Sequence, residues 1–152
     1  MKVGTICSKL VITVKRSDEV NTAARRMRDA HVGYLVVVET DPSASWVRVV
    51  GVLTDRDLVV MLLARDVSPN AVSVGDVMTA NPVTVLESDS VETALRKMRE
   101  SGVRRLPVIS QKGNELVGII STDDILKVIA GDAQDLVATT VVERVLEGAR
   151  RS

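Results

Sequence analysis

A chain of 152 residues, 45% of them hydrophobic, is long enough for one domain of ordinary size with its own core. Its 20 basic and 20 acidic residues cancel, which argues against nucleic acid and acidic membranes as partners. Cys7 and His31 are the only residues of their types, so neither an internal disulfide nor a metal site is expected. No long apolar run occurs, so we expect a cytoplasmic protein without a signal peptide or membrane span.

Short clusters rich in valine alternate with helical patterns along the first half. A small strand is predicted before a helix over "SDEVNTAARRMRDA" (17–30), whose apolar residues recur at three- and four-residue steps. The clusters "YLVVV" and "VRVVGVL" predict two buried strands in hairpin register, joined by a loop at "ETDPSASW". With a closing helix, the first half is predicted as β-α-β-β-α.

The second half repeats the first. Residues 12–38 align without gaps on residues 83–109, and thirteen of the twenty-seven positions are identical. The alignment resumes with 50–58 on 117–125, after four residues in the hairpin loop that only the first copy carries. Two copies of one β-α-β-β-α unit are therefore expected.

The domain organisation follows from this repeat. Pro69-Asn70 lies in the segment between the copies, which is typical of a linker. The expected units are a first repeat at 1–66, a linker at 67–73, a second repeat at 74–131 and a C-terminal helix at 132–152. The first helix of each copy is expected to open at Ser17 or Ser88, because a hydroxyl followed by acidic residues suits a helix N-terminus.

Each copy contains a turn of glycine, hydroxyl and aspartate, "GVLTDRD" in the first and "GIISTDD" in the second. Locally, this predicts a helix capped by its hydroxyl, Thr54 or Ser121, with the aspartate at the third helical position. Such a turn also suits a ligand, because free N–H groups and a hydroxyl bind phosphate. The carboxylate of Asp57 or Asp124 offers two acceptors to the vicinal hydroxyls of a ribose. The two interpretations do not exclude each other.

These turns, together with "GVRRLPV" (102–108), carry a family resemblance: across nearly its whole length the chain resembles a tandem pair of cystathionine-β-synthase (CBS) domains. The expected fold class is therefore α/β of the α+β type. Two β-α-β-β-α repeats would pack sheet to sheet with pseudo-two-fold symmetry and ligand clefts between them. The resemblance also implies a homodimer, because CBS pairs commonly associate through their helices.

The resemblance further implies which residues bind ligand. In each copy the aspartate would hold ribose and the hydroxyl would contact phosphate. Adenine would lie beside two segments, and two arginines would lie near the phosphates. The residues in question are Thr54, Asp57, Ser121, Asp124, Val83, Thr84, Leu106, Pro107, Arg104 and Arg105. For Val83, Leu106 and Val108 core packing is an open alternative, as are surface ion pairs for the arginines.

The first copy departs from the family pattern. It carries His31-Val32-Gly33-Tyr34 where the second carries Gly102-Val103-Arg104-Arg105, so its phosphate affinity is in doubt. If only one aspartate binds ligand, we therefore expect it to be Asp124.

No arrangement of nucleophile and base occurs, and the P-loop and dinucleotide fingerprints are missing, so we expect neither catalysis nor an enzyme. The leading hypothesis is a regulatory module that binds an adenosine-containing nucleotide and signals to an unidentified partner protein. AMP, ADP and ATP are the first candidates, and S-adenosylmethionine and NAD are others, since all share adenosine. The alternatives are a structural dimerisation module without ligand and a small nucleotide hydrolase or transferase.

The C-terminal segment "DAQDLVATTVVERVLEGARR" predicts a helix with one apolar stripe. This stripe would pack back on its own domain or contribute to the dimer interface. Its expected members are Leu136, Val137, Val141, Val142, Val145 and Leu146.

Overall fold

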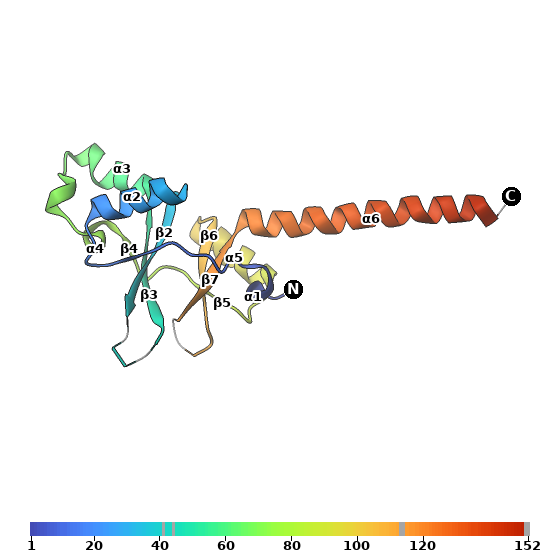
Figure 1. The fold of residues 1–152 in the computed structure, drawn as a ribbon, viewed down its shortest axis with the longest axis horizontal. Coiled ribbons are helices and arrows are strands. Elements are labelled where there is room, and N and C mark those ends of the chain that lie inside the picture. Colours follow the sequence, from blue (N-terminus) through green and yellow to red (C-terminus); the bar gives the residue numbers. More distant parts are fainter. Residues whose placement is uncertain (41, 44, 113–114, 151–152) are drawn as a thin grey trace.

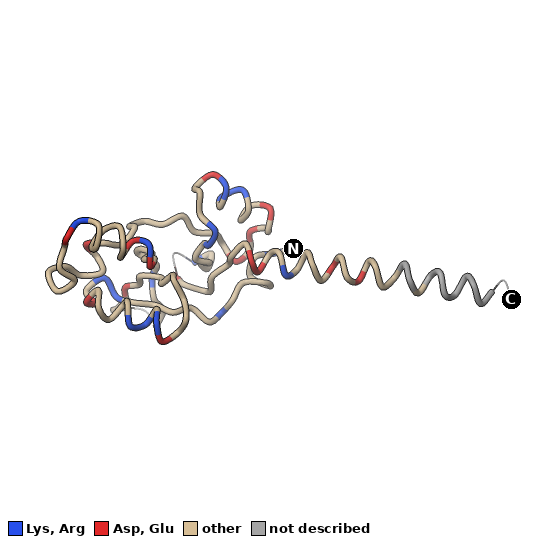
Figure 2. The backbone as a smooth tube through the Cα atoms, turned by 90° about the horizontal axis from the view of Figure 1, so that it is seen from above, with Lys and Arg blue, Asp and Glu red and all other residues tan. Residues whose placement is uncertain are grey.

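Two small sheets lie side by side, and a long helix projects away from the second (Figure 1). The computed structural model describes residues 1–152 except 41, 44, 113, 114, 151 and 152, and the side chains at 140, 141 and 143–150 lie outside this description. Acidic and basic residues are interspersed over both repeats (Figure 2).

The first sheet has the order β1-β2-β3-β4. Strand β1 runs parallel to β2, while β2 with β3 and β3 with β4 are antiparallel. Helix α2 connects β1 to β2, and α3 follows β3. The bounds are β1 Thr13–Lys15, α2 Val20–Ala30, β2 Tyr34–Thr40, β3 Val47–Thr54, α3 Asp55–Met61 and β4 Thr79–Ala80.

The second sheet repeats this arrangement with the order β5-β6-β7. Strand β5 is parallel to β6, and β6 is antiparallel to β7. The bounds are β5 Val85–Leu86, α5 Val91–Ser101, β6 Arg105–Ile109, β7 Leu116–Ser121 and α6 Thr122–Arg150. Both halves therefore confirm the predicted β-α-β-β-α order.

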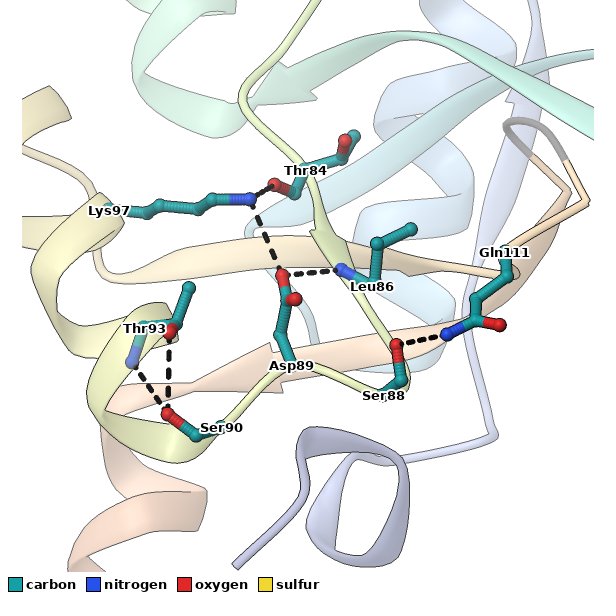
Figure 3. Close-up of polar contacts among 8 residues, drawn as sticks. All are labelled: Thr84, Leu86, Ser88, Asp89, Ser90, Thr93, Lys97 and Gln111. Atoms are coloured by element: carbon teal, nitrogen blue, oxygen red, sulfur yellow. Dashed lines mark hydrogen bonds and ion pairs between the residues drawn. The ribbon is translucent and has the colours of Figure 1, made fainter.

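The first helix of each repeat begins two residues later than expected. The N-cap of α2 is Glu19 rather than a residue at Ser17, and the N-cap of α5 is Ser90 rather than Ser88. The Ser90 hydroxyl accepts a hydrogen bond from the Thr93 amide at 3.2 Å (Figure 3). Ser88 instead accepts a bond from the Gln111 side chain at 2.7 Å.

An aspartate in each turn before the helix explains this displacement. Asp18 accepts a hydrogen bond from the Lys15 amide at 2.9 Å, and Asp89 accepts one from the Leu86 amide at 3.1 Å. These bonds close a short turn between the strand and the helix. The prediction that the helices begin at Ser17 and Ser88 did not include this turn. In the second repeat the Lys97 ammonium lies 3.5 Å from Asp89, which adds an ion pair to the turn (Figure 3).

The two repeats exchange short segments. Helix α1 (Val3–Ile6) begins the first repeat along the chain but packs on the second, where Val3 joins the core beside Val85 and Leu106. Helix α4 (Val74–Val77) begins the second repeat along the chain but packs in the core of the first. Each packed unit therefore includes residues that lie next to the other repeat along the chain.

Matching backbone bonds hold the two exchanged segments. The Val3 amide donates to the Asp89 carbonyl at 2.8 Å, and the Val74 amide donates to the Asp18 carbonyl at 2.9 Å. Since Val3 and Val74 are 71 positions apart, like the repeats, the pseudo-two-fold symmetry extends to these segments.

The glycines of the two turns allow the exchanged segments to approach closely. A Cβ on Gly51 would lie 2.5 Å from the Met78 sulfur, and one on Gly118 would lie 2.6 Å from the Ser8 carbonyl oxygen. Cys7 occupies the place in the second repeat that Met78 has in the first, and it is buried. Strands β2 and β6 shift register beside these glycines. Close backbone packing and an irregular strand therefore account for both glycines.

The two sheets pack through an apolar layer of their own, formed by Val36, Val38 and Val49 from the first and Ile109 from the second. An antiparallel bridge between Arg48 and Glu115 links β3 to the segment before β7. This layer confirms the packing of sheet on sheet.

Helix α6 continues without a break through the boundary expected at residue 132. Leu136, Val137 and Val142 belong to the expected stripe and are mostly exposed, whereas Val141, Val145 and Leu146 lie outside the described side chains. At 3.6 residues per turn, Leu136 and Val142 point about 120° apart, so the single stripe was a wrong prediction. None of the described helices combines the length and apolarity needed to cross a membrane.

Candidate ligand cleft

The first turn forms a complete capping box. The Thr54 amide donates to Asp57 Oδ2 at 2.8 Å, and the Asp57 amide donates to Thr54 Oγ1 at 3.1 Å. Two free N–H groups at the start of α3 are thereby satisfied. Only the oxygen of the Thr54 hydroxyl takes part, so within the described structure its proton remains for another acceptor.

The second turn forms the same box with one more bond. The Ser121 amide donates to Asp124 Oδ2 at 2.9 Å, and the Asp124 amide donates to Ser121 Oγ at 3.2 Å. In addition the Ser121 hydroxyl donates to the same carboxylate oxygen at 2.6 Å. The local interpretation of both turns is therefore confirmed, and the second turn uses its hydroxyl proton internally.

A cavity of about 460 Å³ opens at the first turn, between the two repeats. We call it the inter-repeat cleft. Thr54 and Asp57 of the first repeat line one side, and Gly102, Val103 and Arg105 of the second line the other. Its remaining lining residues are Tyr34, Val52, Arg56, Thr79, Asn81, Pro82, Val83 and Ser101. The first turn therefore meets residues 102–105 of the second repeat in the cleft, beside Tyr34 of its own repeat.

An arginine-rich cavity of about 380 Å³ adjoins the cleft and shares most of its lining. Arg56, Arg104 and Arg105 contribute three guanidinium groups, and Asp55 contributes a carboxylate. Because α3 has only seven residues, the arginines are the main source of positive charge here. Guanidinium groups bind phosphate oxygens through paired hydrogen bonds, so this side of the cleft suits an anion.

Tyr34 and Arg105 occupy equivalent positions at the starts of β2 and β6, and both line the cleft. Burial raises the pKa of the Tyr34 hydroxyl above its ordinary value, while the positive charge of Arg105 lowers it by a smaller amount. Tyr34 is therefore a neutral group that offers the cleft a ring face and a hydroxyl.

The apolar end of the cleft contains Pro82 and Val83. In the first repeat, the Val36 amide donates to the Ile12 carbonyl at 3.1 Å. The equivalent of Val36 is Pro107, which has no N–H, so the equivalent bond to the Val83 carbonyl is missing from the described backbone. Val83, with 42% of its surface exposed, thus combines an apolar side chain with an unused backbone acceptor.

The structure brings together only part of the predicted site. Thr54, Asp57, Val83 and Arg105 line the inter-repeat cleft, and Arg104 lines the adjoining cavity. Leu106 is fully buried in the core of the second repeat, and Pro107 is buried opposite Ile119 in the middle of its sheet. The Thr84 carbonyl accepts a hydrogen bond from the Lys97 ammonium at 2.9 Å (Figure 3).

Several residues of the cleft were not predicted. Arg56 belongs to the first turn, "GVLTDRD", and Thr79, Asn81 and Pro82 precede β5. The signal that could have identified them was the repeat itself, because a two-fold relation places each turn opposite a segment of the other copy. Among the described residues no three His, Cys, Asp or Glu side chains are placed to hold a metal ion.

Comparison with known proteins identifies the family. The family described as CBS domain matches residues 3–64 and 74–131. An uncharacterised protein of Methanopyrus kandleri is 31% identical over 128 residues, which are 84% of this chain and 62% of that protein. Hypoxic response protein 1 of Mycobacterium tuberculosis is 33% identical over 127 residues, 84% of this chain and 80% of that protein.

Solved structures agree with this match. Hypoxic Response Protein I, determined with two coordinated zinc ions, has a TM-score of 0.72 at 32% identity, covering 84% of this chain and 98% of that one. The CBS domain pair of the protein MJ0100, in complex with 5′-methylthioadenosine and S-adenosyl-L-methionine, has a TM-score of 0.72 at 25% identity. It covers 87% of this chain and 98% of that one. The chain therefore belongs to the CBS domain family and carries two CBS domains in tandem.

Proposed function

We propose that the chain is a regulatory module that binds an adenosine-containing nucleotide in the inter-repeat cleft. The observation that carries the proposal is the meeting, in the inter-repeat cleft, of the Thr54–Asp57 turn, Val83 and Arg105, with Arg104 in the adjoining cavity. Each matches one part of a nucleotide. The related pair of MJ0100, which was solved with two adenosine compounds, supports this ligand class.

The carboxylate of Asp57 is suited to the ribose. One of its oxygens accepts the Thr54 amide, which leaves the other oxygen as an acceptor for the vicinal hydroxyls. A hydrogen bond to a charged group contributes about 1.5 to 3 kcal/mol. We expect Asp57→Ala to weaken binding by an amount in this range.

The base is proposed to lie against Pro82 and Val83. The unused Val83 carbonyl would accept a hydrogen bond from the exocyclic amine of adenine. Guanine carries a carbonyl at that position, which would face the Val83 carbonyl without a proton between them. The proposal therefore predicts adenine over guanine.

AMP, ADP and ATP fit the proposal best, because Arg56, Arg104 and Arg105 match a phosphate chain. S-adenosylmethionine carries a positive sulfonium and would gain less from these arginines. The site holds no arrangement for turnover, so the proposed output is a change in the packing of the two repeats that a partner protein reads.

A thermal-shift comparison of ATP, ADP, AMP and GTP tests the proposal. A ligand at one hundred times its dissociation constant adds about 2.7 kcal/mol to the free energy of unfolding. We expect the adenine nucleotides to raise the melting temperature of the wild type clearly more than that of Asp57→Ala, and GTP to have little effect. The proposal fails if no adenosine compound stabilises the wild type.

The second candidate function is a dimerisation module that binds no ligand. Exposed apolar side chains on α6 favour association, since Leu126 and Ile129 are more than half exposed near the base of the helix. We propose that the chain forms a homodimer in either case. If no ligand binds, the capping boxes alone explain why both turns carry a hydroxyl and an aspartate.

A further inference from the structure

We infer that each chain binds one anionic nucleotide, at the Thr54–Asp57 turn, and that the Ser121–Asp124 turn is only a helix cap. The inference deepens the proposed function and rests on it. The first turn faces residues 102–105 of the second repeat. The two-fold relation sets residues 31–34 of the first repeat against the second turn. The two turns therefore face different sequences, although they resemble each other.

Charge distinguishes the two positions. The equivalent of Arg56 in the second turn is Asp123, and the equivalent of Arg104 in the facing segment is Gly33. Two guanidinium groups are thus replaced by a carboxylate and a hydrogen. Asp123 and Asp124 thus place two carboxylates in the second turn, where the first turn has Arg56 and Asp57, and a carboxylate repels phosphate.

Gly33 presents no side chain to either turn. Its carbonyl accepts a hydrogen bond from the Asp55 amide at 3.1 Å, and a Cβ at this position would meet the Asp55 carboxylate of the first turn. The first repeat therefore has no counterpart of the Arg104 side chain to hold an anion at the second turn.

The position for the base differs as well. The Ile12 carbonyl, equivalent to that of Val83, already accepts the Val36 amide. Pro107 prevents this bond at Val83. Only the cleft at the first turn therefore has a spare carbonyl for an exocyclic amine.

The hydroxyl groups of the two turns also differ in their hydrogen bonds. Ser121 donates its proton to Asp124, so neither its proton nor that carboxylate oxygen is fully available to a ligand. Thr54 only accepts from Asp57, and its proton remains for a phosphate oxygen. The charges, the spare carbonyl and the hydroxyl proton thus favour the same turn.

Calorimetric titration with ADP tests the inference on the full chain. Asp57→Ala and Asp124→Ala are a matched pair, because each removes the aspartate of one capping box. We expect one ADP per wild-type chain, a dissociation constant about 10- to 100-fold weaker in Asp57→Ala, and one within about twofold of the wild type in Asp124→Ala. Asp124→Asn, which keeps an acceptor for the Ser121 amide, replaces the alanine variant if the latter unfolds.

Arg104→Gln tests the requirement for an anion. We expect it to weaken ADP about tenfold and to leave the affinity for adenosine unchanged, because adenosine has no phosphate. Two equal sites per chain, or a loss of binding in the Asp124 variants alone, would overturn the single-site inference and leave the proposed function standing. Equal losses for ADP and adenosine in Arg104→Gln would overturn the anion requirement. Binding of neither compound to the wild type would overturn the proposed function as well.

Discussion

Tyr34 and Arg105 are the same position of the two repeats, and they lie together on the wall of one cavity. One repeat thus contributes a neutral ring and the other a permanent positive charge. The internal symmetry of the chain is therefore broken at the place where the two repeats meet.

The pairing of Tyr34 with Arg105 can be measured by pH titration, since Tyr34 is the only tyrosine of the chain. Burial raises its pKa in the folded protein, so its tyrosinate absorbance should appear above pH 10, the ordinary range. As the pH rises, the Tyr34 hydroxyl therefore loses its proton in the unfolded chain at a lower pH than in the folded protein. The free energy of unfolding is therefore independent of this group below about pH 10 and falls as the pH rises further.

Replacing Arg105 should change the pKa of Tyr34 in a known direction. Because Arg105 lowers the pKa of Tyr34, Arg105→Gln should shift the tyrosinate transition to still higher pH. Tyr34→Phe is the control that removes the signal. A wild-type transition at the value of free tyrosine, unchanged in Arg105→Gln, would contradict the burial and the proximity of these groups.

The segment exchange predicts that the first residues of the first repeat stabilise the second. Val3 and Val74 are both fully buried, in the cores of the second and the first repeat respectively. Val3→Ala and Val74→Ala should each lower the free energy of unfolding by about 2 kcal/mol, because each leaves a small cavity. Leu10→Ala is the control, since Leu10 is 81% exposed.

Urea denaturation followed by circular dichroism measures all three variants. Equal losses in the two valine variants would agree with equivalent packing of α1 and α4. A Val3→Ala variant as stable as Leu10→Ala would show that α1 does not pack as described.

The two turn glycines should differ in their tolerance of a methyl group. A Cβ at Gly118 meets the backbone oxygen of Ser8, which has little freedom to move. A Cβ at Gly51 meets the sulfur of Met78, which rotates away more easily. Gly118→Ala should therefore destabilise by about 1 to 3 kcal/mol, and Gly51→Ala by less. Thermal melting of both variants measures these losses. A larger loss of stability in Gly51→Ala than in Gly118→Ala would refute this account of the packing.

The proposed dimer is tested by sedimentation. We expect a dimer for the wild type at tens of micromolar. Truncation after Gly131 should weaken it, because the exposed Leu136 and Val137 would be lost while the second core stays intact. A wild-type monomer would exclude the dimer, and an unchanged dimer after truncation would show that this part of α6 does not contribute.

The order of the strands and helices could be predicted from the sequence because periodicity and the internal repeat both reflect local structure. The capping boxes were predictable for the same reason. Even Cys7, matched to Met78 by the repeat, lies in the equivalent buried place.

The composition of the cleft could not be predicted in this way. Asp124 was grouped with Arg104 and Arg105 because they belong to one repeat, whereas the described cavities place these arginines opposite Thr54 of the other. Pairing across a two-fold axis depends on how the sheets pack, and local pattern does not encode that. Leu106 and Pro107 were assigned to a ligand although a continuous apolar run fits a buried central strand equally well.

A crystal structure of the chain grown with ADP tests the central claim most directly. The account predicts density for one nucleotide per chain in the inter-repeat cleft, with the ribose at Asp57, the base against Val83 and the phosphates near Arg104 and Arg105. Density at the Ser121–Asp124 turn, or an empty cleft at saturating ADP, would contradict it.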